Sequence, residues 1–194
     1  MKKALFTLLV SLGIAMVSQA QFELKFQAGL NTSHLTSEHV KWGHEGRIGY
    51  QFGVSAIIGE KFYVEPGVSW VTSTKDLYEK SDTTSLNFTT HINMIRIPVL
   101  LEYHVLGSEE TLADLRIFAG PAGSFITGVK SDTDDLSKDD FKKFIFDIDA
   151  GAAVDVWIFF LEWHYVFGLT PVFNEDSDAK LQAFYGNLGV RIKF

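Results

Sequence analysis

Residues 184–194 read FYGNLGVRIKF and alternate between two kinds of side chain. Apolar residues and one glycine stand at every second position from Phe184 to Phe194, with polar, charged or small residues between them. Because successive side chains of a β-strand point to opposite faces, this period of two predicts a strand with one apolar and one polar face. The polar face carries the cations Arg191 and Lys193. A strand of this kind is typical of the closing strand of a transmembrane β-barrel.

The same period recurs along the chain. Seven earlier segments alternate in this way: 22–30, 48–58, 62–72, 95–105, 115–125, 144–156 and 159–167. Each is near the roughly 9–11 residues that a tilted strand needs to cross the hydrocarbon core. With the last strand they predict an all-β fold, an eight-stranded antiparallel up-and-down transmembrane β-barrel.

The connections between these segments alternate in length. Residues 59–61, 106–113 and 156–158 are short, whereas 31–46, 73–90, 127–142 and 170–180 are long and polar. Outer-membrane barrels have short periplasmic turns and long outward loops. The sequence therefore predicts a bacterial outer-membrane location, with both mature termini periplasmic and four long loops extracellular.

The N-terminus has the pattern of a cleaved signal peptide. Lys2 and Lys3 precede an apolar stretch from Ala4 to Val17, and residues 18–20 read SQA. Such an apolar stretch is shorter than the roughly 20 residues of a membrane anchor, which is the alternative. We therefore expect a signal peptide at 1–20, cleavage before Gln21 and a barrel domain at 21–194.

Composition narrows the classes of function. The chain has no cysteine, so disulfides and a lipid-modified cysteine are excluded. A net charge of −7 without a dense basic stripe argues against a nucleic-acid partner. Sixteen glycines and 17 phenylalanines with only four prolines favour closely packed β-strands.

The direction of the two faces separates a membrane barrel from a soluble lipocalin-like ligand carrier, which would turn its apolar face inward. Glycines would only weaken the outer face of a soluble barrel, but they fit a narrow lumen among large polar residues. They lie on the charged face: Gly29, Gly49, Gly53, Gly67, Gly120, Gly151 and Gly189. The charged face is therefore predicted to line the lumen.

That lumen would hold a network of seven acids and six bases with two histidines. Its members are Glu23, Lys25, Arg47, Glu65, Arg96, Glu102, His104, Arg116, Asp147, Asp149, Asp155, Glu162, His164, Arg191 and Lys193. Buried charges are tolerated when they are paired, so a near-balanced set predicts a lumen filled by ion pairs. A water-filled channel needs about sixteen strands, and we expect no pore here.

Two same-face pairs, Glu102/His104 and Glu162/His164, could serve acid–base chemistry or bind a metal. Neighbouring arginines favour salt bridges instead. The acidic stretch from Asp132 to Asp140 could bind a cation, but it lacks the spacing of an EF-hand loop. We therefore expect no catalytic, metal or cofactor site and no enzyme, with an outer-membrane lipid-modifying enzyme as the alternative.

Several short motifs resemble a known family. They are IRIPVLLEY at 95–103, FAGPAG at 118–123, YVFGLT at 165–170 and GVRIKF at 189–194. Together they are similar to the PorT-like outer-membrane β-barrels of Bacteroidetes, whose named member is associated with protein secretion and gliding. The resemblance implies a barrel fold and leaves the activity open.

The sequence thus predicts a small barrel that is a structural, surface-binding or envelope-complex component. Expected partners are outer-membrane lipid and lipopolysaccharide, and an envelope protein complex. The barrel-assembly machinery is expected to recognise the C-terminal strand that ends at Phe194.

Overall fold

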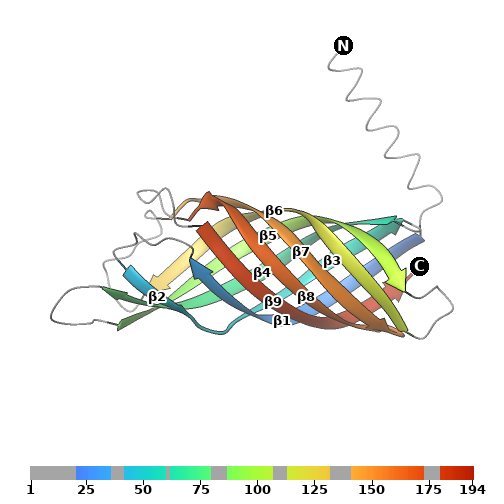
Figure 1. Cartoon of the computed structure of the whole chain (residues 1–194), viewed down its shortest axis with the longest axis horizontal. Coiled ribbons are helices and arrows are strands. Elements are labelled where there is room, and N and C mark those ends of the chain that lie inside the picture. The colour runs from blue at the N-terminus through green and yellow to red at the C-terminus, as the bar shows by residue number, and fades with distance from the viewer. Residues whose placement is uncertain are drawn as a thin grey trace, which may run out of the picture.

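The computed structural model describes residues 21–35, 42–59, 62–79, 87–106, 113–131, 141–172 and 180–194. These form nine antiparallel strands that surround one lumen (Figure 1). The strands are β1 (Gln21–Leu35), β2 (Trp42–Gly46), β3 (Gly49–Gly59), β4 (Phe62–Glu79), β5 (Asn87–Leu106), β6 (Ala113–Ser131), β7 (Phe144–Val156), β8 (Phe159–Pro171) and β9 (Lys180–Lys193). Among the described residues, no helix is long and apolar enough to cross a bilayer.

The predicted eight-stranded closed barrel is confirmed. Apart from β2, the strands pair in chain order, and β1 closes the ring against β9, with Leu24 opposite Ile192 and Phe26 opposite Val190. The ninth strand, β2, is not an additional strand of the barrel wall. It pairs with the far part of β4 and prolongs β3 beyond a break at residues 47 and 48.

The strands are strongly staggered. The row of paired residues that starts at Leu188 on β9 can be followed around the barrel in two directions. Through β1, β3, β4, β5 and β6 the row reaches β7 at Phe144. Through β8 it reaches β7 at Val154. The two arrivals on β7 are ten residues apart. Such a shear accompanies strands tilted by roughly 35–45° in closed barrels. Any row of side chains across the strands therefore climbs from one end of the barrel toward the other.

The two ends of the barrel differ. The end that we call the turn end holds the start of β1, the C-terminus and the connections β3–β4, β5–β6 and β7–β8 (Figure 1). The opposite, loop end holds the connections β4–β5, β6–β7 and β8–β9. The β3–β4 and β7–β8 connections contain two residues each, whereas the β6–β7 connection contains 12.

The strand lengths at the loop end correct the prediction. Much of what we predicted as long polar loops is strand: β4 continues to Glu79, β5 begins at Asn87 and β6 continues to Ser131. The apolar alternation from which we predicted the strand ends stops before the strands do. Strand pairing continues beyond the apolar part of the outer face. Thr32 and His34, for example, are exposed on β1 beyond Leu30.

The predicted direction of the faces is also confirmed. Apolar side chains such as Phe26, Leu30 and Leu188 are exposed on the outer wall, whereas the alternating charged residues are buried. Two inward glycines show why small residues are needed. A Cβ at Gly151 would lie 2.5 Å from the Phe118 ring, and one at Gly189 would lie 2.5 Å from the Phe160 ring.

The inner face near the loop end differs from the polar lumen that we predicted. Part of it is formed by a cluster that we call the apolar cap, consisting of Val71, Ile92, Met94, Ile126, Phe141, Ile145, Val172 and Leu181. The lumen is therefore layered, with charges toward the turn end and an apolar plug toward the loop end.

Candidate functional site

Twelve of the predicted lumen residues are buried inside the barrel, and we call them the lumen charge network. They are Glu23, Lys25, Glu65, Arg96, Glu102, Arg116, Asp147, Asp149, Asp155, Glu162, His164 and Arg191. They come from β1, β4, β5, β6, β7, β8 and β9, so residues distant in the sequence meet only because the barrel closes.

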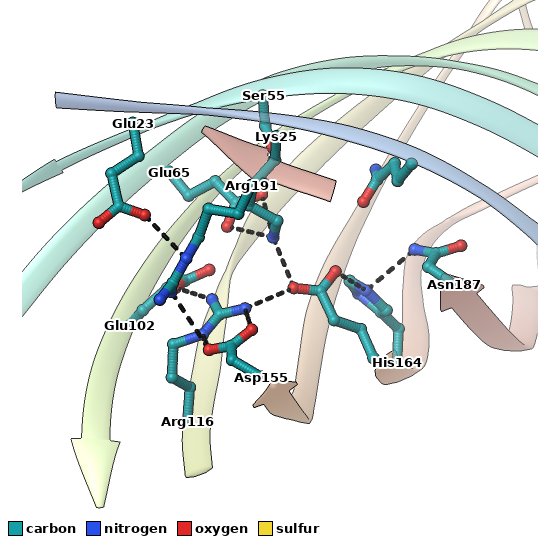
Figure 2. Close-up of polar contacts among 12 residues, drawn as sticks. Glu23, Lys25, Ser55, Glu65, Glu102, Arg116, Asp155, His164, Asn187 and Arg191 are labelled. Carbon is teal, nitrogen blue, oxygen red and sulfur yellow. Dashed lines mark hydrogen bonds and ion pairs between the residues drawn. The ribbon is translucent and has the colours of Figure 1, made fainter. Parts of the chain in front are cut away.

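Lys25 lies between two carboxylates near the middle of the network (Figure 2). Its Nζ is 2.7 and 2.8 Å from the two carboxylate oxygens of Glu65 and 2.5 Å from Glu162 Oε1. Ser55 donates a hydrogen bond of 2.5 Å to Glu65 as well. The ammonium group also lies 4.8 Å from the centre of the Phe160 ring. Lys25 thus ties β1 to β4 and β8 across the lumen.

Arg116 joins three carboxylates from three strands (Figure 2). Its Nε and Nη2 donate to the two oxygens of Asp155 at 2.5 and 2.9 Å, and Nη2 also reaches Glu162 Oε1 at 3.1 Å. Nη1 donates to Glu102. A guanidinium group suits this position because its five donors form a rigid fork.

A second part of the network lies nearer the apolar cap. Arg96 donates to both oxygens of Asp147 at 2.8 and 2.7 Å and to Asp149 at 3.2 Å. His164 lies between Asp149, at 3.1 Å from Nδ1, and Glu162, at 3.4 Å from Nε2. Because Glu162 contacts Lys25, Arg116 and His164, the two parts form one continuous network.

The closing seam of the barrel carries its own ion pairs. Arg191 on β9 lies 2.9 Å from Glu23 on β1 and 3.2 Å from Asp155 on β7. Lys193 reaches Glu23 at 3.4 Å, but its side chain is 49% exposed. At the end of the same seam, the Phe194 amide donates to the Phe22 carbonyl at 3.0 Å.

Three predicted network members occupy other environments. Arg47 is exposed at the break between β2 and β3, where the strand alternation on which its assignment relied is interrupted. Lys193 lies at the rim. His104 is partly exposed and contacts Asp114 on β6.

The charge balance therefore differs from our expectation. Seven acids are buried, but only four permanently charged bases are buried with them, namely Lys25, Arg96, Arg116 and Arg191. The sequence pattern overestimated the bases because it counted Arg47 and Lys193 as lumen residues. His164, held between two carboxylates, is positioned to carry a further positive charge.

Glu65, Glu102 and Glu162 bring one oxygen each to within 4.8 Å of one another, a spacing that could hold a metal ion. However, the Lys25 ammonium already contacts Glu65 and Glu162. This arrangement is one of ion pairs, and the carboxylates are sealed from the lipid by the barrel wall. The geometry therefore favours a filled lumen over a site for chemistry.

The sequence reasoning missed several residues that complete the packing. Asn187 bonds to His164 at 3.2 Å and also accepts from Gln51. Tyr185 lies beside Arg96, with the guanidinium carbon 5.4 Å from its ring centre. Tyr185 and Asn187 stand on the inner face of the quoted strand, so the alternation contained this information. The alternation did not indicate the apolar cap, because the residues of the cap are apolar at inward positions where the pattern predicts polar side chains.

Two sequence predictions lie outside the described residues. These are the signal peptide at 1–20 and the acidic stretch from Asp132 to Asp140.

A closed antiparallel barrel with an apolar outer wall and buried internal charges defines a small transmembrane β-barrel of the bacterial outer membrane. The chain belongs to the family described as outer membrane protein beta-barrel domain, whose model matches residues 5–174. No curated protein matches it.

Solved structures share the fold at low sequence identity. The outer membrane protein OprG from Pseudomonas aeruginosa has a TM-score of 0.55 and 11% identity, covering 90% of this chain and 97% of that one. Neisserial surface protein A has a TM-score of 0.53 and 13% identity, covering 89% and 97%. LpxR from Salmonella typhimurium is a more distant match, with a TM-score of 0.38 and 8% identity, covering 87% of this chain and 99% of that one.

Proposed function

We propose that this protein is a non-conducting surface barrel, which acts through the strand extensions and loops at its loop end. The observation that carries the proposal is the filling of the lumen at two successive levels. Ion pairs fill it toward the turn end, and the apolar cap fills it toward the loop end. A barrel with this interior offers a partner its outer surface and its loop end.

The orientation is part of the same proposal. The loop end faces the cell exterior and the turn end faces the periplasm, as the alternation of connection lengths favours. β4, β5 and β6 are 18, 20 and 19 residues long, which exceeds the roughly 9–11 residues that span the hydrocarbon core. The excess lies toward the loop end, where it forms a platform for binding at the cell surface.

The two rival functions have less support. A soluble ligand carrier needs an apolar interior and a polar exterior, the reverse of the faces described above. A lipid-modifying enzyme needs its reactive groups at a rim that lipid can reach. The acid–histidine cluster of Glu162, His164 and Asp149 lies inside the barrel, where lipid does not reach it. We therefore propose that the protein is not an enzyme.

A finer assignment, to the PorT-like barrels of Bacteroidetes and to an envelope or secretion complex, rests on the short sequence motifs. Mild crosslinking in native outer membranes followed by purification would test it. A defined complex recovered at a constant ratio to the barrel would support this role. Recovery of the barrel alone would oppose it. Recognition of the strand ending at Phe194 by the assembly machinery stays part of this proposal.

The absence of native cysteine allows a clean test of orientation and surface exposure. Lys130 is exposed on β6 toward the loop end, and Lys193 is exposed at the turn end. In intact cells, a membrane-impermeant maleimide should label Lys130→Cys, whereas Lys193→Cys should react only after the outer membrane is permeabilised. The reverse order of labelling would overturn the proposed orientation.

A further inference from the structure

Among the described residues, the interior of the barrel holds one acid more than it holds cations. Seven acids and four permanently charged bases are buried there. His164 adds a fifth positive charge if it is protonated between Asp149 and Glu162. Lys193, which reaches Glu23 from the rim, adds a sixth. A buried charge without a counter-charge is very costly, so the interior requires one further positive charge.

The missing charge belongs near Glu102 on β5. Its side chain is buried, and its Oε2 accepts a hydrogen bond from Arg116. Its Oε1 is buried without a hydrogen-bond donor in the part of the chain that the structure describes. Arg116 is itself shared with Asp155 and Glu162. Glu102 therefore receives only part of one positive charge.

A second carboxyl group, that of Glu65 on β4, lies close to Glu102 (Figure 2). The two residues are diagonal neighbours on the inner face, because Glu102 is paired with Tyr63. One oxygen each of Glu65, Glu102 and Glu162 lie within 4.8 Å of one another. Ionised carboxylates only accept hydrogen bonds, so two of them cannot bond to each other. A carboxyl group that keeps its proton has an O–H donor and can bond to the other.

A proton fits this position better than a metal ion does. The Lys25 ammonium group already lies 2.7 Å from Glu65 and 2.5 Å from Glu162, and it would repel a second cation among the same oxygens. Ser55 also donates to Glu65 at 2.5 Å. A proton needs only one acceptor oxygen on each side, and the Oε1 atom of Glu102 offers one.

We propose that Glu65 and Glu102 share one proton in the folded barrel, which gives the pair a single negative charge. Carboxyl groups that share a site hold a proton in this way, because two like charges at short range repel each other. The seven buried acids then carry six negative charges, which match the six positive ones counted above. The proposal does not depend on which end of the barrel faces the cell exterior.

Infrared spectroscopy of the folded barrel tests the proposal, in a detergent that has no carbonyl group. At neutral pH, wild-type protein should show the C=O stretch of a protonated carboxylic acid, which ionised carboxylates lack. Glu65→Gln and Glu102→Gln should each abolish this band. Asp114→Asn changes an acid at the rim that contacts His104, and it should leave the band unchanged. Absence of the band from folded wild-type protein, or its persistence in both Gln variants, would overturn the proposal.

Urea unfolding gives an independent readout. Glu102→Gln should change the folding equilibrium constant by less than about threefold, because an amide offers a donor to Glu65 and an acceptor to Arg116, as the protonated acid does. The matched control is Asp155→Asn, which removes an ionised acid that contacts Arg116 and Arg191. It should lower the folding equilibrium constant by about a hundredfold or more.

Heat-modifiable migration on a gel verifies that each variant is folded before it is measured. Equal losses of stability in Glu102→Gln and Asp155→Asn would contradict the shared proton. A loss of stability when a chelator is added to wild-type protein would assign the site to a metal ion, and it would overturn the proposal as well.

Discussion

At the scale of single residues, Arg116 gives the clearest prediction about stability. It is completely buried and compensates Glu102, Asp155 and Glu162, which are themselves buried. Arg116→Leu should lower the free energy of unfolding by about 3–5 kcal/mol, because it leaves buried carboxylates without their cation. Urea unfolding of the barrel in lipid vesicles measures this change.

The control for that substitution is Lys193→Gln, which removes a cation from the half-exposed rim. Its effect should be below about 1 kcal/mol, as for other solvent-exposed ion pairs. Similar losses for both variants would show that the internal pairs are no more important than the rim pair.

The lipid-facing wall gives a second prediction at this scale. Val190 lies near the middle of the outer face of β9, so Val190→Arg should destabilise the folded barrel by about 2–4 kcal/mol. Thr32→Arg places the same side chain outward beyond the apolar part of β1, where the cost should be about 0–1 kcal/mol. The yield of heat-modifiable barrel in outer-membrane fractions compares them. Equal, wild-type yields would mean that Val190 does not face lipid.

At the scale of the element, β9 allows one substitution to be compared on its two faces. Gly189→Ala points its new Cβ at the Phe160 ring and at the backbone of β1, whereas a Cβ at Gly186 meets nothing within 4 Å. Gly189→Ala should therefore cost about 1–3 kcal/mol by overpacking, and Gly186→Ala should be close to neutral. Unfolding of both variants in vesicles checks this, and an equal cost would refute the assignment of inner and outer faces.

The same strand shows what could be predicted from sequence. Its period of two indicated that Arg191 faces inward and Val190 outward, and the structure confirms both. The ends of the strands were harder to predict. Beyond the apolar wall, β1 continues with Thr32 and His34 on its outer face, so hydrogen bonding persists where the hydrophobic pattern has ended.

At the scale of the whole molecule, sequence predicted the barrel and most members of its interior, but not their partners. The contact of Lys25 with Glu65 and Glu162 depends on the shear of the closed barrel, which no single strand reveals. The apolar cap escaped prediction for a related reason. Phe141 and Val172 belong to it although they lie outside the regular strands, and their burial requires the assembled lumen.

The sealed lumen is the central claim, and ionic conductance across a membrane tests it most directly. Purified, refolded protein inserted in planar bilayers should give no stable conductance steps, because the lumen charge network and the apolar cap fill the interior in series. Ohmic, porin-sized steps from protein shown to be folded by its heat-modifiable migration would contradict this account.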